Sequence, residues 1–320
     1  MRLLQMAILV SMAPIISAGQ DFAGRWDVTV ADQGQPKAWW LELGPAGSGQ
    51  GRFVGAPNGG IDPLNDFTVK DGELHFTVQW ERKPPLNGVF TARLVDGKLQ
   101  GDFTLEGKPR LTWTGKRSPV MADKDDGTWR EGKPIQLFNG KDLSGWEPKH
   151  APEVYTQPPS TDPAEWGWSA QDGLLSTKGR GTSLGTQAKF SNFVLHLEFR
   201  VGPRGNSGVG LRGRYEVQIM DDAGRAGTAT AHGTGSVIAH VPASVNAAKP
   251  AGEWQTYDIR LVGRQVTVVL NGTKVSDKAD IAGLTAMAID ANEDEPGALV
   301  LQGDHGAVDF RNIVLTPLIK

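Results

Sequence analysis

The alternation of apolar and polar side chains constrains this chain more than any other feature of its sequence. In residues 193–201 every odd position is apolar, while His196, Glu198 and Arg200 occupy even positions between them. Residues 214–220 follow the same pattern, with Glu216 and Gln218 at polar positions. A period of two is typical of a β-strand that buries one face, because successive side chains point to opposite sides. We therefore expect neighbouring strands whose polar side chains gather on one shared face.

Composition and turn signals extend the β prediction to the whole chain. The 320 residues include 41 glycines and 20 prolines, and no long segment follows the 3.6-residue period of a helix. Hairpin dipeptides such as Asp71-Gly72 and Asp96-Gly97 join strand-like runs, because these residues tolerate the positive φ of tight turns. The predicted fold class is all-β, and the length suggests two domains.

The predicted domain boundaries follow the strand-like runs and the stretch between them. Residues 20–118 are expected to form a small antiparallel β-meander or barrel whose tryptophans are core residues rather than sugar-stacking platforms. The polar stretch 119–133 is typical of a linker. Residues 134–320 hold about a dozen strand-like runs, which favours a two-sheet jelly-roll sandwich. The sequence leaves open whether the first domain binds polysaccharide, covers a groove or mediates assembly.

Residues 1–18 have the pattern of a secretory signal peptide. A basic start is followed by an apolar run from Leu3 to Ile16 and a small pair ending at Ala18. The alternative is a buried first strand or helix. The run is too short to cross a bilayer comfortably, so we expect no membrane span in the mature chain. We expect an exported protein, periplasmic or extracellular, and the lack of cysteine excludes disulfides and a lipobox.

Charge and motif spacing argue against several ligand classes. The net charge is −3 with no Lys/Arg block, which argues against a nucleic-acid partner. The pattern G-x-G-x-x-G at 208–213 is followed by a strand rather than a helix, so we interpret its glycines as keeping a sheet face open. The acidic stretch 290–295 either binds Ca²⁺ or forms a solvated loop, and we favour the loop. The six histidines lack HxH or HExxH spacing, so a divalent metal remains an open question.

The shared polar face carries a candidate carboxylate pair. If their strands are neighbours, Glu198 and Glu216 lie close together, and carboxyls about 5 Å or 6.5–9.5 Å apart perform retaining or inverting glycoside hydrolysis. The Glu-x-Asp-x-x-Glu pattern of laminarinase-type jelly rolls is absent, which argues against a conventional glycosidase. The alternative is an ion-pair ladder of both glutamates with Arg200 and Arg212 on a solvated sheet.

Further polar residues are expected around this face. Asn206 and Ser207 lie in a turn between two strands, at the rim of the face. His305 follows a strand and is expected to hang over the same face. His196 and Glu198 together offer two ligands for a metal, which is a weak signal by itself.

A series of short motifs runs through residues 134–318 in a fixed order. It includes Leu137-Phe138-Asn139-Gly140-Lys141-Asp142-Leu143-Ser144-Gly145-Trp146, Gly205-Asn206-Ser207-Gly208-Val209, Tyr215-Glu216-Val217-Gln218, Gly252-Glu253-Trp254 and Leu301-Gln302-x-x-His305-Gly306. This ordered set resembles the 3-keto-disaccharide hydrolase domain family, a bacterial group with a concanavalin A-like jelly roll. The first β domain lies outside the resemblance.

The resemblance implies cleavage of glycosides whose sugar has been oxidised at C3 by a partner dehydrogenase. A ketone at C3 acidifies the hydrogen on C2, so a base can remove it and the C1 aglycone can leave, with water adding afterwards. This chemistry needs a positioned base, a group that stabilises the enolate oxygen and an acid for the leaving group.

Site roles follow from the resemblance and from the expected positions. Glu216 or Glu198 is the expected base, Arg200 or Arg212 stabilises the enolate, and His305 is the acid or a metal ligand. The residues expected to bind substrate are Asn206, Ser207, Gln218, His196 and Gln302.

The alternative function is a non-catalytic, lectin-like carbohydrate-binding module, because jelly rolls host many sugar binders. The density of ionisable groups on one face favours an enzyme, since lectins rely more on aromatic platforms and amides. The sugar, the linkage, the aglycone and the oligomeric state are not readable from the sequence.

Overall fold

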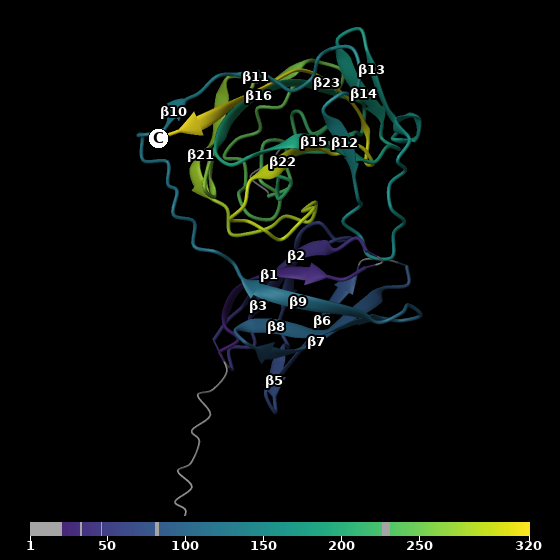
Figure 1. Cartoon of the computed structure of the whole chain (residues 1–320), viewed down its shortest axis with the longest axis vertical. Helices are drawn as coiled ribbons and strands as arrows, with labels where there is room; N and C mark the ends of the chain where they lie inside the picture. The colour runs from purple at the N-terminus through teal and green to yellow at the C-terminus, as the bar shows by residue number, and fades with distance from the viewer. Residues whose placement is uncertain (1–20, 33, 46, 81–82, 226–230) are drawn as a thin grey trace, which may run out of the picture.

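The computed structural model describes residues 21–32, 34–45, 47–80, 83–225 and 231–320, and the predicted signal peptide lies outside them. The described residues form two β units with separate cores, which lie one above the other in Figure 1. The one helix within these ranges is the 3-10 turn η1 (Pro163–Glu165), and none there is long and apolar enough to cross a membrane. The all-β prediction is confirmed.

The first unit is a single curled antiparallel sheet. Its strands are β1 (Gly24–Val30), β2 (Lys37–Leu43), β3 (Gly51–Val54), β4 (Ile61–Leu64), β5 (Thr68–Lys70), β6 (Glu73–Trp80), β7 (Leu86–Val95), β8 (Lys98–Leu105) and β9 (Leu111–Arg117). They follow the order β4-β3-β2-β1-β9-β8-β7-β6-β5. The sheet curls so far that Asn58 Nδ2, in the β3–β4 turn, donates a hydrogen bond to Gln79 O of β6 at 2.9 Å.

Aromatic side chains fill the inside of this sheet. Trp39 meets the rings of Phe53, Trp80, Phe90 and Phe103 edge-on, at centroid distances of 5.5–6.4 Å. Each such pair contributes about 0.5–1.5 kcal/mol beyond the area it buries. The prediction that the tryptophans of this unit are core residues is therefore confirmed. Trp40, the next residue along β2, points to the opposite face of the sheet and leaves this core.

The second unit is a sandwich of two antiparallel sheets. Its strands are β10 (Arg130–Glu131), β11 (Ile135–Gln136), β12 (Trp146–Lys149), β13 (Trp168–Gln171), β14 (Leu174–Lys178), β15 (Ser183–Phe190), β16 (Phe193–Val201), β17 (Asn206–Leu211), β18 (Tyr215–Met220), β19 (Gln255–Val262), β20 (Gln265–Leu270), β21 (Thr273–Asp280), β22 (Gly297–Leu301) and β23 (Ala307–Ile319). The larger sheet runs β13-β14-β23-β16-β19-β20-β21, and β10 and β11 also pair with β23. The smaller sheet runs β12-β15-β22-β17-β18. The predicted two-sheet sandwich is confirmed.

The expectation that 193–201 and 214–220 share a polar face is wrong. These segments form β16 in the larger sheet and β18 in the smaller sheet. Both strands bury their apolar side chains in the same core from opposite sides, so their polar faces point away from each other. Alternation fixes which side chains are buried, but it leaves open which strands are neighbours.

The segment between the units lies against the second unit. Asn192 Nδ2 donates to Asp123 at 2.7 Å, and Arg260 donates to both oxygens of Asp125 at 3.0 and 3.1 Å. Strand β10 then pairs with the end of β23. The stretch expected as a linker thus follows the surface of the sandwich.

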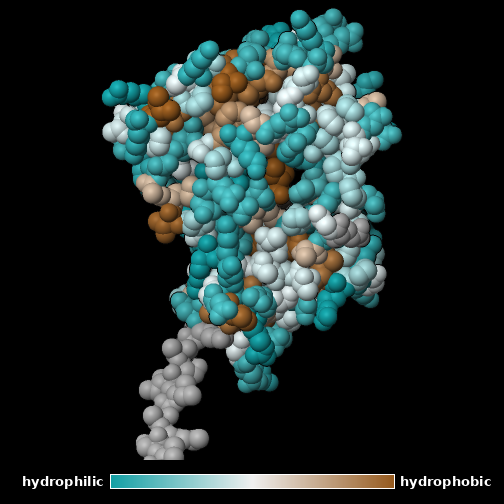
Figure 2. Space-filling view, in the orientation of Figure 1, coloured by the Kyte–Doolittle hydropathy of each residue, from teal (hydrophilic) through white to brown (hydrophobic). Residues whose placement is uncertain are grey.

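The two units meet in a small apolar cluster of their own. It joins Ala38, Trp40 and Val54 of the first unit to Ile238, Ala239, Leu284, Ala286, Ala288 and Ala291 of the second. Trp40 is fully buried and packs edge-on against His240, with ring centroids 5.2 Å apart. Burial lowers the pKa of His240 to about 4, so this imidazole is neutral at pH 7. Hydrophilic residues cover most of the molecular face in Figure 2, which is hollowed where the two units meet.

Replacing Gly283 by Ala tests the packing between the units. A Cβ at Gly283 would lie 2.1 Å from Trp40 Nε1, so we expect the variant to lose about 1–3 kcal/mol of unfolding free energy. The control is Gly202→Ala, whose Cβ would come no nearer than 3.3 Å to any atom, the Cβ of Ala307. Urea unfolding measures both. Equal stability of the two variants would contradict this account of the interface.

Candidate functional site

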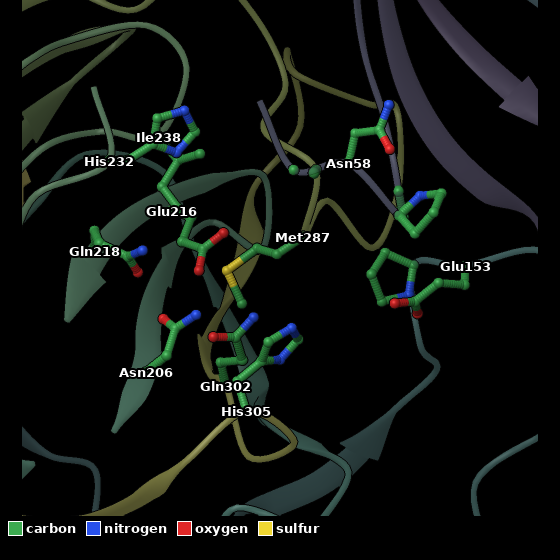
Figure 3. Close-up of a pocket in the computed structure, with 15 residues that line it drawn as sticks. Asn58, Glu153, Asn206, Glu216, Gln218, His232, Ile238, Met287, Gln302 and His305 are labelled. Carbon is green, nitrogen blue, oxygen red and sulfur yellow. The ribbon is translucent and has the colours of Figure 1, made fainter. Parts of the chain in front are cut away.

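A pocket of about 180 Å³ lies at the junction of the two units. Its polar lining from the second unit comprises Glu153, Asn206, Glu216, Gln218, His232, Gln302 and His305. The first unit contributes residues 56–59, the turn between β3 and β4. Figure 3 shows the Glu216 carboxylate directed into the pocket, with Asn58 and Glu153 on the side opposite Asn206 and Gln218.

Glu216 is the central group of this pocket. It lies on the polar face of β18, which the loops at 231–241 and 284–288 and the first unit cover, and its exposed fraction is 4%. No described side chain or backbone group hydrogen-bonds to its carboxylate. Burial raises the pKa of Glu216 to about 8, with nearby His305 opposing the shift. A buried carboxyl without a partner is expensive to ionise, so this position is poised for proton transfer.

The strand beside β18 makes room for this side chain. Gly210 and Gly208 of β17 stand opposite Glu216 and Gln218. A Cβ at Gly208 would lie 2.3 Å from Glu216 Oε1, so a larger residue there would collide with the carboxylate. The glycines of the 208–213 pattern thus keep the sheet face open, and Glu216 itself occupies the space beside Gly208.

Two amide side chains in the pocket have unused hydrogen-bonding capacity. The Oδ1 of Asn206 and the Oε1 of Gln302 are buried and have no hydrogen-bond partner in the part of the chain that the structure describes. The backbone around them is fixed, because Ser207 Oγ donates to Gln302 O at 2.9 Å and Gln302 N donates to Gly208 O at 3.0 Å. Buried amide oxygens that lack partners are suited to accept hydrogen bonds from the hydroxyls of a ligand.

His305 stands beside Glu216 in the same pocket. Its Nδ1 lies 2.7 Å from Asp304 Oδ1. This hydrogen bond raises the pKa of His305, against the effect of burial, and the charges of Asp304, Glu216 and Glu153 raise it further. The pocket therefore combines a carboxyl whose neutral form is favoured by burial with an imidazole whose protonated form is favoured by its neighbours.

The structure brings together five residues named from the sequence and separates the others from them. Those in the pocket are Asn206, Glu216, Gln218, Gln302 and His305. Ser207 is fully buried and supports Gln302 instead of lining the pocket.

The predicted roles of Glu198, Arg200 and His196 at this site are wrong. These residues lie on β16, in the other sheet. Glu198 pairs with Arg311 at 2.6 Å, Arg200 with Asp309 at 2.6 Å, and His196 with Asp258 at 2.7 Å. This is the ion-pair ladder that we gave as the alternative, although with different partners. Glu198 and Glu216 therefore form no carboxylate pair.

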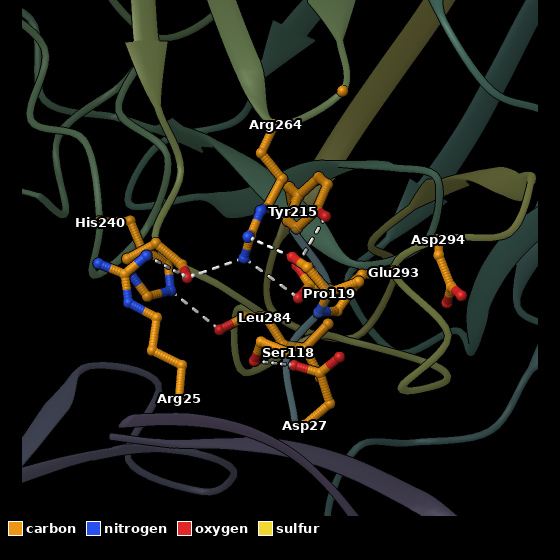
Figure 4. Close-up of polar contacts among 12 residues, drawn as sticks. Arg25, Asp27, Ser118, Pro119, Tyr215, His240, Arg264, Leu284, Glu293 and Asp294 are labelled. Atoms are coloured by element: carbon orange, nitrogen blue, oxygen red, sulfur yellow. Dashed lines mark hydrogen bonds and ion pairs between the residues drawn. The ribbon is translucent and has the colours of Figure 1, made fainter. Parts of the chain in front are cut away.

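Arg212 is buried in a polar network between the units, so its expected role at the substrate is also wrong. It donates to Tyr215 Oη at 3.1 Å and to Gly263 O at 2.7 Å. Tyr215 in turn donates to Glu293 at 2.7 Å, and Arg264 pairs with Glu293 at 3.3 Å (Figure 4).

The same network reaches the first unit through Asp27, whose carboxyl accepts a hydrogen bond from Ser118 (Figure 4). Burial and the nearby charge of Glu293 raise the pKa of Asp27 to about 8. The acidic stretch 290–295 is therefore tied into the protein: Glu293 joins this network, and Asp290 pairs with Arg214 at 2.7 Å. Within the described ranges, no three Asp, Glu or His side chains are grouped so as to hold a metal ion.

Sequence reasoning missed Glu153, His232 and the first unit's turn. Glu153 belongs to an irregular loop, and His232 lies in a turn beside Gly233, so neither carries a periodic signal. His232 packs against the first unit, since a Cβ on Gly60 would lie 3.3 Å from its ring. Only tertiary contact brings these residues to Glu216.

The pH dependence of stability tests the burial of Glu216. The pKa of Glu216 in the folded state is raised above that of an unfolded glutamate. Its contribution to the free energy of unfolding is therefore fully present below about pH 4.5 and is lost as the pH rises through about 8. A glutamine cannot ionise, so Glu216→Gln avoids this loss. The unfolding free energy of the variant relative to that of the wild type should therefore increase by on the order of 2–4 kcal/mol from pH 5 to pH 9. The measurement is urea unfolding at both pH values.

Glu198→Gln is the matched control for that experiment. Burial tends to raise the pKa of Glu198, but hydrogen bonds from Asn312 and Arg311 outweigh it and hold the pKa below its usual range. The unfolding free energy of Glu198→Gln should therefore not rise above that of the wild type at pH 9. The burial argument is wrong if both variants respond alike.

The chain is similar to several proteins of known structure. A candidate glycosyl hydrolase from Parabacteroides distasonis is 27% identical, with 62% of this chain and 91% of that one covered and a TM-score of 0.46. Another from the same organism is 21% identical, covers 58% and 94%, and has a TM-score of 0.43. A carbohydrate-binding module from Bacillus subtilis is 12% identical, covers 54% and 96%, and has a TM-score of 0.35. No curated protein sequence matches the chain.

The family comparison agrees with the resemblance seen in the motifs. Residues 133–316 match the 3-keto-alpha-glucoside-1,2-lyase-like domain, whereas the motif series was placed at 134–318. The match spans the sandwich from β11 to residue 316 within β23, which is more than half of the sequence. The chain therefore belongs to the family of 3-keto-alpha-glucoside-1,2-lyase-like domains.

Proposed function

We propose that this protein is a carbohydrate-active enzyme that cleaves the glycosidic bond of 3-keto-glycosides, with Glu216 as the base. Family membership supports action on carbohydrates, and the family's description suggests the 3-keto substrate. The observation that carries the proposal is a buried carboxyl without a partner, aimed into a pocket lined by amides and imidazoles.

The proposed reaction begins with removal of the C2 hydrogen. The ionised Glu216 carboxylate takes this proton, and the electrons of the C2–H bond move into an enolate on the C3 oxygen. The enolate then reforms the C3 ketone while the bond from C1 to the aglycone oxygen breaks, which leaves a C1=C2 double bond. The departing oxygen takes up a proton, and addition of water across the double bond yields the free 3-keto sugar. A ketone is required for the first step, so the unoxidised glycoside does not react.

The other pocket residues supply the remaining needs of this chemistry. His305, whose pKa is raised by its hydrogen bond with Asp304, in its protonated form donates a proton to the departing oxygen or a hydrogen bond to the enolate oxygen. Asn206 and Gln302 offer their unpartnered amide oxygens to sugar hydroxyls. A raised pKa makes Glu216, once ionised, a stronger base than an exposed glutamate.

The direct test incubates the purified protein with a 3-keto-disaccharide and with its unoxidised parent, with and without EDTA. We expect cleavage of the keto sugar alone. Deuterium from D₂O should appear at C2, as detected by NMR. Glu216→Gln should lower kcat/KM by about 10²–10⁴-fold, whereas Glu198→Gln should leave it unchanged. Loss of cleavage in EDTA would show that the reaction requires a divalent metal ion.

Saturable sugar binding without turnover would instead identify a non-catalytic binding module. Cleavage of both sugars at similar rates would contradict the requirement for a ketone.

The pH profile of kcat/KM provides a second test. Because Glu216 titrates near pH 8 and must be ionised to act as a base, kcat/KM should rise as the pH increases through about 8. Because His305 must be protonated to act as the acid, its deprotonation should produce a falling limb in the same profile. Asp304→Asn removes the hydrogen bond that raises the pKa of His305, so this falling limb should move to lower pH. A rising limb that stays near pH 4 would rule out buried Glu216 as the base.

A further inference from the structure

One wall of the pocket comes from outside the family domain. Residues 56–59, in the turn between β3 and β4, line the pocket across from Glu216. The family match begins at residue 133, so this wall belongs to the additional β unit of this chain.

Contacts on both sides of the pocket hold this wall in place. Trp40 packs into the second unit beside Gly283. The buried Lys37 of β2 donates to Ala151 O at 2.8 Å and to Thr156 Oγ1 at 3.1 Å. Ala151 and Thr156 lie on either side of Glu153, which lines the pocket. The first unit therefore also holds the loop of the second unit that carries Glu153.

The same loop is anchored by its middle residues. Val154 is buried in the core of the first unit. Tyr155 N donates to Asp32 Oδ2 at 2.6 Å, and Tyr155 Oη donates to Pro109 O at 2.8 Å. The wall opposite Glu216 is therefore built on two folded units and anchored by hydrogen bonds and apolar packing.

The enclosed space is small for a glycan site. Pockets that hold drug-sized ligands have volumes of about 300–1,000 Å³. A pocket of about 180 Å³ is close to the size of one sugar ring, and the turn at 56–59 closes it on the side opposite Asn206 and Gln218.

We propose that the first β unit determines substrate length: its turn at 56–59 restricts the pocket to a single terminal 3-keto sugar ring. This inference rests on the proposed function for the identity of the sugar. Glycosides whose keto ring lies within a longer chain would then be excluded by the wall, whatever their linkage to the aglycone.

The test narrows the pocket from the side of the first unit. Gly59 has a φ of +75°, and a Cβ added there would have no atom within 4 Å. Asn tolerates this backbone region, so Gly59→Asn adds a side chain at the wall with little strain. Gly97→Asn is the matched control, because Gly97 has a φ of +74°, equally open surroundings and an exposed position in the β7–β8 turn.

Two substrates are compared, a disaccharide with a terminal 3-keto ring and a trisaccharide whose central ring carries the ketone. The wild type should prefer the terminal ring by about 100-fold or more in kcat/KM. Gly59→Asn should lower kcat/KM for the disaccharide by about 10–200-fold, while Gly97→Asn should match the wild type. Equal cleavage of both substrates, or equal behaviour of the two variants, would overturn the proposal and leave the proposed function intact.

Calorimetry of unoxidised sugars binding to Glu216→Gln tests the restriction to one ring separately from the proposed function. If no keto sugar is cleaved, the proposed function fails. The restriction to one ring is still supported if a monosaccharide binds and Gly59→Asn abolishes that binding. Binding of a trisaccharide through its central ring, or no binding of any sugar, would overturn it.

Discussion

The packing of Trp40 into the second unit is the contact on which the rest of the site depends. Trp40 follows Trp39 on β2, and the pleat sends one ring into the first core and the other across the interface. The outer ring seats against Gly283, where no side chain larger than hydrogen fits. The polar face of β18 thereby becomes an interior surface. An isolated sandwich would expose that face more, and the pKa of Glu216 would lie closer to that of an ordinary glutamate, since burial is the main cause of its shift.

Two buried carboxyls in this protein have similarly raised pKa values but different surroundings. Asp27 accepts a hydrogen bond from Ser118 and stands close to Glu293, whose charge Arg264 balances. Such a network fixes how the two units meet and presents nothing to a ligand. The Glu216 carboxylate has no hydrogen-bond partner among the described residues and faces a cavity. A perturbed pKa alone therefore does not identify a catalytic group. The combination of burial, missing partners and access to a pocket separates Glu216 from Asp27.

The local part of this structure was predictable from the sequence, and the assembly of its parts was not. Alternation located β16 at its observed bounds, because burial of one face is a local property of a strand. The charged sequence of β21 carries no such signal, since it lacks a continuous apolar face. Pairing between strands is set by long-range contacts, so Glu198 was placed beside Glu216 although the two lie in different sheets. The motif series recovered five pocket residues of the family domain, namely Asn206, Glu216, Gln218, Gln302 and His305. Glu153, His232 and the turn at 56–59 come together only through packing between loops and units.

The two units supply different parts of the pocket: the second unit carries the proton-transfer groups, and the first unit carries the wall that limits which substrates fit. Glu216, His305, Asn206 and Gln302 belong to the family domain, and strand pairing fixes their backbone within one sheet or next to it. The opposite wall is a surface turn on a unit that has its own aromatic core. A surface turn tolerates substitution, because its side chains carry little of the core packing, whereas a change on β18 or β17 disturbs the carboxyl directly. Gly208 illustrates the contrast, since any side chain there would meet Glu216. Substrate range can therefore change at residues 56–59 while the proton-transfer groups stay fixed, provided that the Trp40 interface keeps both units in register.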